Sequence, residues 1–184
     1  MSRVTEEIDF LVAASAELDD YLSSNVMFWP LKTTRKKLTP GNLLLAHKRI
    51  RAIKDLANFN PAFEKAENLI EKVISTRRSA WQKKASEELE VRLRLWKSTL
   101  EEYLEDGVID GSYPAQITNR VLIDLLGEES NLIQMALERE LSRVDESLKR
   151  IINDGLFIWE PEFAEAFPKQ RFWYLYQGMG EVEK

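Results

Sequence analysis

Apolar residues recur every three or four positions along most of the chain, which is the spacing of one face of an α-helix. This pattern predicts a first helix over residues 4–23, which starts with an acidic turn. Residues 25–37 break the pattern and contain Pro30, so they are expected to form a loop. The fold class is therefore predicted as all-α, a bundle of about five principal helices with one of them long.

Two short motifs predict where the next helices begin. Thr39 is followed by Pro40, and a hydroxyl cap before a proline at the first helical position is a strong start signal. The second helix is expected to run from there to about Ala57. Asn60 and Pro61 repeat the same pattern and predict the start of a third helix.

The apolar spacing after Pro61 continues to about residue 105, which predicts one helix of about 45 residues, or roughly 65 to 70 Å. A break near Ser79 is the alternative, because Ser79 and Gln82 have the spacing of a capping box. We favour the continuous helix. Such a helix would protrude from a compact chain and would need a second copy to cover Trp81, Leu89 or Leu93, so a homodimer or higher oligomer is expected.

The second half of the chain predicts two more helices and an aromatic segment. Tyr113 and Pro114 open a helix that is expected to end at Leu126, with Gly127 as its stop, and residues 128–153 form the next helix. Residues 156–176 hold eight of the eighteen aromatic residues, and their spacing fits short helices or extended segments equally well.

We expect the aromatic segment to pack across the bundle as a lid, the alternative being a surface for self-association or for a partner. Residues 1–155 are thus predicted to form the bundle, and residues 156–184 a C-terminal segment of the same domain with a short flexible tail. The residues proposed for an interface are Trp81, Trp96, Trp159 and Trp173.

Composition narrows the class of protein. The chain has no cysteine, which excludes disulfides and thiolate metal sites and fits a reducing compartment. No apolar run reaches the roughly 18 to 20 residues that cross a bilayer, and residues 1–9 lack a signal-peptide pattern. A soluble, cytoplasmic protein without membrane contact is expected.

Charge is distributed unevenly. The chain has 26 Lys and Arg against 31 Asp and Glu, yet between Asp20 and Asp55 it has no acidic residue and eight basic ones. Without those eight, the remainder has 18 basic against 31 acidic residues, an excess of thirteen negative charges. This basic segment consists of Lys32, Arg35, Lys36, Lys37, Lys48, Arg49, Arg51 and Lys54. Such asymmetry indicates an anionic partner without naming it.

The basic segment has features of an anion site. On the second helix, His47, Lys48, Arg51 and Lys54 fall within one arc, apart from the apolar face. The start of that helix is expected to offer unpaired N–H groups at Gly41 and Asn42, where a phosphate could bind. The candidates for binding an anion or nucleic acid are Lys32, Arg35, Lys36, Lys37, Lys48, Arg51 and Lys54, with Trp29 as a stacking residue. The alternative is that these cations pair with the chain's own acidic helices, such as residues 87–90.

Enzymatic motifs are scarce. His47 is the only histidine, which excludes paired-histidine zinc sites and di-iron sites within one chain. The sequence has no Gly-x-Ser-x-Gly elbow, no phosphate-binding glycine loop and no dinucleotide fingerprint. Pairs such as Glu101 with Glu105, or Glu138 with Glu140, do not stand out in an acidic helical protein. No metal or cofactor is expected, and an enzyme is not favoured.

The leading hypothesis is therefore a non-enzymatic helical interaction or scaffold protein that associates with itself. The alternative is a module that binds nucleic acid or phosphate through residues 32–54. Salt dependence separates the two hypotheses, because phosphate contacts weaken steeply as the salt concentration rises.

Overall fold

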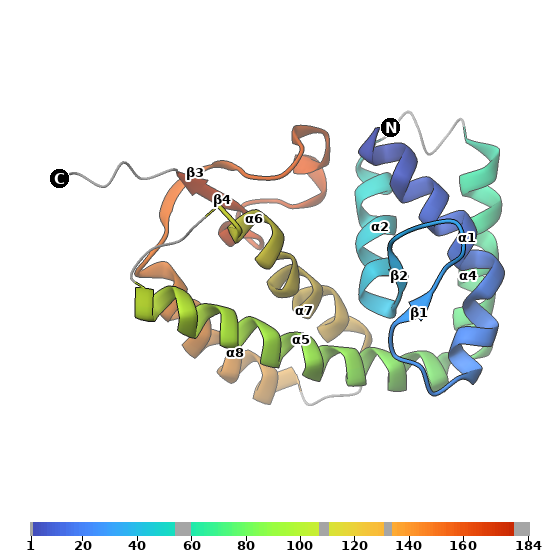
Figure 1. The fold of residues 1–184 in the computed structure, drawn as a ribbon, viewed down its shortest axis with the longest axis horizontal. Coiled ribbons are helices and arrows are strands. Elements are labelled where there is room, and N and C mark those ends of the chain that lie inside the picture. Colours follow the sequence, from blue (N-terminus) through green and yellow to red (C-terminus); the bar gives the residue numbers. More distant parts are fainter. Residues whose placement is uncertain (1, 54–59, 107–110, 131–133, 179–184) are drawn as a thin grey trace.

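The computed structural model describes residues 2–53, 60–106, 111–130 and 134–178. Among these residues the chain is mostly α-helical, with only short strands, which confirms the all-α class. Helices α1 (Arg3–Ser23), α2 (Pro40–Ala52) and α4 (Pro61–Thr76) stand side by side in one half of the molecule (Figure 1). The other half contains α6 (Tyr113–Gln116), α7 (Thr118–Glu129) and α8 (Gln134–Lys149).

The predicted helix starts at Pro40 and Pro61 are confirmed, and both depend on local capping. The Thr39 side chain accepts a hydrogen bond from the Asn42 N–H at 3.1 Å. The Asn60 side chain accepts two, from the N–H groups of Ala62 and Phe63, each at 3.1 Å. These bonds satisfy N–H groups that lack a partner in the first turn of a helix. The expected extension of the second helix to Ala57 falls partly in residues 54–59, outside the described residues; α2 ends at Ala52.

The loop before α2 contains a short antiparallel ladder between β1 (Trp29–Pro30) and β2 (Lys37–Leu38). Its two leucines, Leu31 and Leu38, are buried against α1 and α2. The loop is therefore anchored by its own apolar side chains, and its cations lie between the anchors.

The prediction of one continuous third helix is wrong. The helix breaks at Arg77, whose backbone angles of φ −108° and ψ 31° are not helical, and α5 (Arg78–Asp106) continues in a different direction (Figure 1). The break lies two residues before Ser79, the alternative position. After the break, α5 passes beneath α1, α2 and α4 and then between α7 and α8 (Figure 1), and its residues Trp81 and Leu89 become fully buried. Burial of this face within one chain explains why the helix does not protrude.

Two helix ends also differ from the prediction. Gly127 does not stop a helix: it is buried inside α7, which continues to Glu129, so packing outweighs the low helix propensity of glycine. The next helix ends at Lys149 rather than near Asn153, because Asn153 begins a strand.

The aromatic segment forms both of the structures that its spacing allowed. Strand β3 (Asn153–Phe157) pairs antiparallel with β4 (Tyr176–Gly178), with an irregularity between Asp154 and Leu156. Between them lie two 3₁₀ helices, η1 (Pro161–Ala166) and η2 (Trp173–Leu175).

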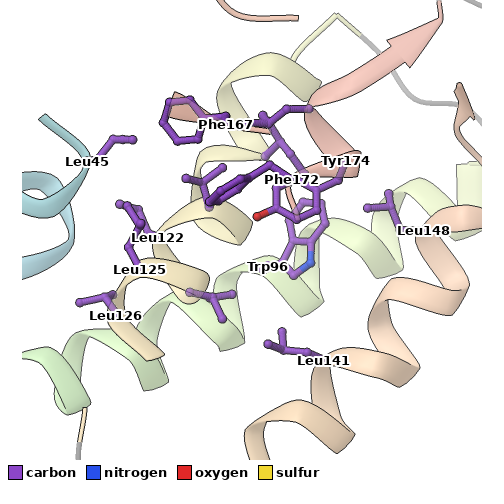
Figure 2. Packing of buried hydrophobic residues seen from close by; sticks show 14 of the residues in the cluster. Leu45, Trp96, Leu122, Leu125, Leu126, Leu141, Leu148, Phe167, Phe172 and Tyr174 are labelled. Atoms are coloured by element: carbon purple, nitrogen blue, oxygen red, sulfur yellow. The ribbon is translucent and has the colours of Figure 1, made fainter. Parts of the chain in front are cut away.

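The core consists of two clusters. The first lies among α1, α2, α4 and the start of α5 and contains Phe10, Phe63 and Trp81. The second lies among α5, α7, α8 and the aromatic segment, with Trp96 surrounded by rings of that segment and by leucines of α7 and α8 (Figure 2). The aromatic segment is therefore packed onto the helices, as expected of a lid. Helix α2 supplies residues to both clusters.

Candidate functional site

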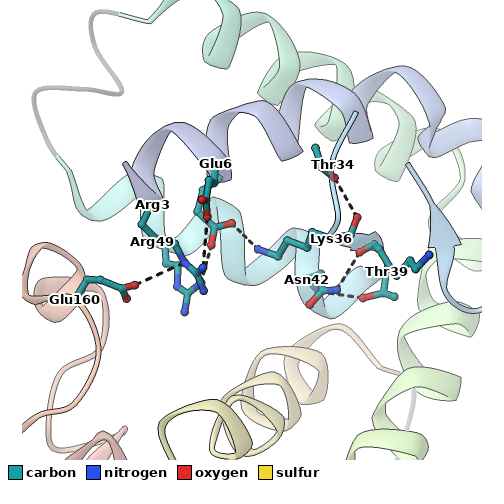
Figure 3. A network of polar contacts seen from close by, with 10 residues as sticks. Arg3, Glu6, Thr34, Lys36, Thr39, Asn42, Arg49 and Glu160 are labelled. Carbon is teal, nitrogen blue, oxygen red and sulfur yellow. Dashed lines mark hydrogen bonds and ion pairs between the residues drawn. The ribbon is translucent and has the colours of Figure 1, made fainter. Parts of the chain in front are cut away.

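Two cations of the basic segment point into the protein and share one carboxylate. Lys36 binds Glu7 Oε2 through its amine at 2.5 Å, and Arg49 binds Glu7 Oε1 at 2.6 Å. Figure 3 shows Lys36 and Arg49 pointing toward α1 from the loop and from α2. Glu7 is 2% exposed and Arg49 4% exposed, so both charges are withdrawn from water.

Burial alone would raise the pKa of Glu7, but the neighbouring Lys36 and Arg49 outweigh burial and hold the pKa below its usual value of 4.5. For Lys36 the balance is opposite: burial lowers its pKa more than Glu7 raises it, and Arg49 adds repulsion. In this group one carboxylate faces two cations, and their combined attraction stabilises its charged form. Glu7 is therefore ionised in the folded protein at neutral pH.

The other side of Arg49 contacts the aromatic segment. Its guanidinium carbon lies 4.7 Å from the centre of the Trp159 ring and 5.4 Å from that of Phe163. Nearby, Arg3 of α1 forms an ion pair with Glu160 at 3.7 Å. The Glu7 group thus connects α1, the loop, α2 and the aromatic segment.

The start of α2 is also already occupied by a carboxylate. The expectation of an unpaired Gly41 N–H is wrong: it donates to Glu88 Oε2 at 2.7 Å, and the Thr39 hydroxyl donates to Glu88 Oε1 at 2.8 Å. Arg92 binds the same Oε1 through two nitrogens at 2.8 and 3.0 Å. Glu88 is fully buried, so it takes the place where a phosphate was expected.

Sequence reasoning missed Glu88, although one signal was present. Glu88 follows Trp81 by seven residues and precedes Trp96 by eight, which places it on the buried face of α5. A charged residue at a core position needs a buried partner, and this distinguishes Glu88 from its exposed neighbours Glu87 and Glu90.

Three cations of the loop remain on the surface. Lys32, Arg35 and Lys37 are exposed, and none of them forms an ion pair with another described residue. Trp29 beside them is partly buried, because its indole N–H donates to Glu17 Oε2 at 2.7 Å and its ring meets Tyr21 edge-on. The candidate Lys54 lies outside the described residues.

The remaining cations line a groove between α2, α7 and η1, with a volume of about 610 Å³. Its walls carry three basic side chains from α2 and three carboxylates from α7 and η1, interspersed with apolar residues. The lining residues are Leu44, His47, Lys48, Arg51, Ala52, Leu125, Glu128, Glu129, Glu165, Ala166 and Pro168. The groove was not foreseen, although the arc of His47, Lys48 and Arg51 on the second helix is one of its walls.

Most of the groove's charged residues have partners. Glu67 of α4 binds both His47 Nε2, at 2.5 Å, and Arg51, at 2.7 Å. On the opposite wall, Glu128 pairs with Arg171 at 2.5 Å, and Glu129 pairs with Arg78 at 2.8 Å. The two walls therefore present charges that are held in place before any ligand binds.

Lys48 is different. No carboxylate of the described part of the chain lies within ion-pair distance of its amine, which instead sits 5.3 Å from the Phe172 ring centre and 5.6 Å from that of Phe167. Burial lowers the pKa of Lys48, the nearby Arg171 lowers it further, and Glu128 opposes them only in part.

The four tryptophans proposed for an interface lie in two environments. Trp81 and Trp96 are fully buried in the two core clusters. Trp159 and Trp173 are partly buried; Trp159 donates to the Pro114 carbonyl at 2.8 Å, and the Lys149 amine lies 5.0 Å from the Trp173 ring centre. Since the chain itself covers Trp81 and Leu89, the need for a second copy to cover them no longer applies.

Within the described ranges, no group of three or more His, Asp or Glu side chains is placed to hold a metal ion. Among the same residues, no helix combines the length and the apolar character that crossing a bilayer requires. Comparisons with known protein families, with curated proteins and with solved structures gave no match.

Proposed function

We propose that this protein is a non-enzymatic interaction protein that binds a segment of a partner protein in the groove between α2, α7 and η1. The observation that carries this proposal is the lining of the groove. Apolar side chains alternate there with basic groups on one wall and acidic groups on the other. Such a surface combines apolar contact, which supplies affinity, with placed charges, which fix the orientation of a partner.

The fixed charges favour this use. Arg51 and Glu129 are already held by Glu67 and Arg78, so their positions need not be ordered again when a partner binds. The groove is also open to solvent. It would leave much of a small molecule exposed, whereas a peptide chain can follow it.

Ala52→Arg tests the proposal. Ala52 lines the groove and is only partly exposed, so a long charged side chain at this position should occupy the space of the partner. Peptides would be selected against the wild-type protein from a displayed random library, and their binding measured by calorimetry and by chemical-shift mapping. We expect shifts at the groove residues and a loss of at least about tenfold in affinity in the variant.

Ala115→Arg is the matched control, since Ala115 is exposed on α6 and does not line the groove. It should bind the peptides as the wild type does. Peptides that map to another surface, or that bind the Ala52→Arg variant unchanged, would contradict the proposal.

A second candidate function, binding of a nucleic acid, has its own support. Lys32, Arg35 and Lys37 are exposed on one loop and form no ion pairs with described residues. Because Lys36 and Arg51 are engaged by Glu7 and Glu67, fewer cations are available than the sequence suggested. With three phosphate contacts, the slope of log affinity against log salt would be near −3 for duplex DNA.

Fluorescence anisotropy with labelled single-stranded and duplex oligonucleotides, at about 50 and 200 mM salt, tests this second function. Replacing Lys32, Arg35 and Lys37 by Gln should abolish the salt-sensitive binding. Replacing the exposed Lys65, Lys72 and Lys83 by Gln gives the same change in net charge elsewhere and should have little effect. Absence of binding at 50 mM salt would leave only the first proposal.

A further inference from the structure

We propose that the partner segment carries an acidic side chain whose carboxylate binds between Lys48 and Arg171, at the side of the groove formed by α2 and the aromatic segment. This inference rests on the proposed function and names the chemistry of its partner. Its basis is the distribution of paired and unpaired charges around the groove.

Lys48 is the groove cation that lacks a carboxylate among the described residues. His47 and Arg51 share Glu67, and Arg171 beside the groove has Glu128. The amine of Lys48 lies near the faces of two phenyl rings, at 5.3 and 5.6 Å, while Glu128 acts on it from beyond ion-pair distance. Ring faces attract a cation less strongly than a carboxylate does when the cation is partly withdrawn from water.

Lys48 and Arg171 both lie near the ring of Phe172. The Arg171 guanidinium carbon lies 5.2 Å from the centre of Phe172, and the Lys48 amine lies 5.3 Å from the same centre. Burial lowers the pKa of Lys48, and repulsion from Arg171 lowers it further. A carboxylate that accepts hydrogen bonds from both groups would remove the repulsion and replace the water that Lys48 has lost.

The opposite wall decides between a carboxylate and a phosphate. Glu128, Glu129 and Glu165 all line the groove, and Glu128 and Glu129 already pair with Arg171 and Arg78, so that wall has no described cation left over to balance a second negative charge. A group with a charge near −2 would be repelled more strongly than a single carboxylate. The geometry therefore favours an Asp or Glu side chain, with the apolar neighbours of that residue lying against the apolar lining.

Lys48→Met tests the assignment, because methionine keeps an unbranched apolar side chain and removes only the amine. The peptides selected against the wild type would be compared with copies in which each acidic residue is changed to its amide. We expect a shared acidic position, a loss of about tenfold on either single change, and little further loss when both changes are combined. Lys32→Met, on the exposed loop, is the control and should leave the affinity unchanged.

A second readout follows the amine itself. Nitrogen-detected NMR of the lysine side chains should show the pKa of Lys48 rising when the acidic peptide binds and staying low with the amide peptide. Retained binding of the amide peptide would show that the Lys48→Met variant is folded.

The outcomes separate the two proposals. Peptides that occupy the groove but share no acidic position, or whose loss on the two changes is additive, would overturn the role of Lys48 and leave the groove intact. A selection that yields no groove-binding peptide would overturn the proposed function and this assignment together.

Discussion

Two buried carboxylates, Glu7 and Glu88, determine what the basic segment can do. Glu7 holds Lys36 and Arg49, and Glu88 fills the first turn of α2. Each carboxylate comes from a helix far along the chain, so the basic segment is used largely to join elements. Buried charges that lose a partner are costly, which makes both residues good targets for mutation.

Glu88→Gln should lower the free energy of unfolding by about 3 kcal/mol, because Arg92 and the Thr39 hydroxyl would face an amide in place of a carboxylate. Chemical denaturation followed by circular dichroism measures this change. Glu87→Gln is the matched control: Glu87 is exposed and 3.9 Å from Lys83, so its loss should cost less than about 0.5 kcal/mol. Equal effects of the two substitutions would contradict the role given to Glu88.

Gly41→Ala tests the same contact from the other side. A Cβ atom at Gly41 would lie 3.0 Å from Glu88 Oε1, closer than such atoms normally approach. We expect the substitution to destabilise the wild type but to be neutral or stabilising in a Glu88→Ala background, where the crowded atom is gone and alanine is the better helix former.

Glu7 should make the free energy of unfolding depend on pH in the acidic range. Its pKa is lowered in the folded protein, so its contribution is fully present above the unfolded pKa of about 4.5 and is lost as the pH falls through the lower folded value. Glu7→Gln should therefore destabilise at neutral pH, and the difference from the wild type should shrink below about pH 4. Urea titrations between pH 3 and 7 measure this difference, and a difference independent of pH would refute the argument.

Of these residues, the sequence predicted the positions on α2 but did not predict the ion pairs with Glu7, and the reason is physical. Helical spacing correctly placed Lys48 and Arg51 on one arc of α2, because spacing on a helix is local. The pairing of Lys36 and Arg49 with Glu7 spans 29 and 42 residues, and no local pattern reports contacts at such a distance.

At the scale of elements, the correct predictions were those set by neighbouring residues. Thr39 and Asn60 cap the helices that follow them, whatever those helices pack against. The break at Arg77 instead accompanies the burial of Trp81, whose ring lies in the first core cluster and whose N–H donates to Glu129 at 2.9 Å. Tertiary packing of this kind overrides a continuous apolar pattern.

The aromatic segment should be required for folding of the second cluster. Deleting all residues after Asp154 would remove Phe163, Phe167, Phe172 and Tyr174, each at most 1% exposed. We expect the truncated protein to lose its sharp thermal transition in circular dichroism, because Trp96 and its leucine neighbours would face water. A truncated protein that melts sharply at an unchanged temperature would show that the segment is dispensable.

At the scale of the whole molecule, α2 and α5 link the two core clusters. Helix α2 places Leu43 and Ile50 in the first cluster and Leu45 in the second. Helix α5 places Trp81 in the first cluster and Trp96 in the second. The two halves are therefore expected to unfold together, although Figure 1 shows them as separate groups of helices.

Phe172→Ala tests this coupling. Phe172 is 1% exposed in the second cluster, so the substitution should cost about 3 to 5 kcal/mol. If the whole molecule unfolds cooperatively, this loss of stability should affect both halves equally. Hydrogen exchange measured by mass spectrometry should then speed up in α1 as much as in α7. Phe28→Ala removes a ring that is 41% exposed and should leave exchange in both helices nearly unchanged. If α1 kept its wild-type protection in Phe172→Ala, the two clusters would be separate folding units, and binding in the groove between α2 and α7 would then depend on how those units are held together.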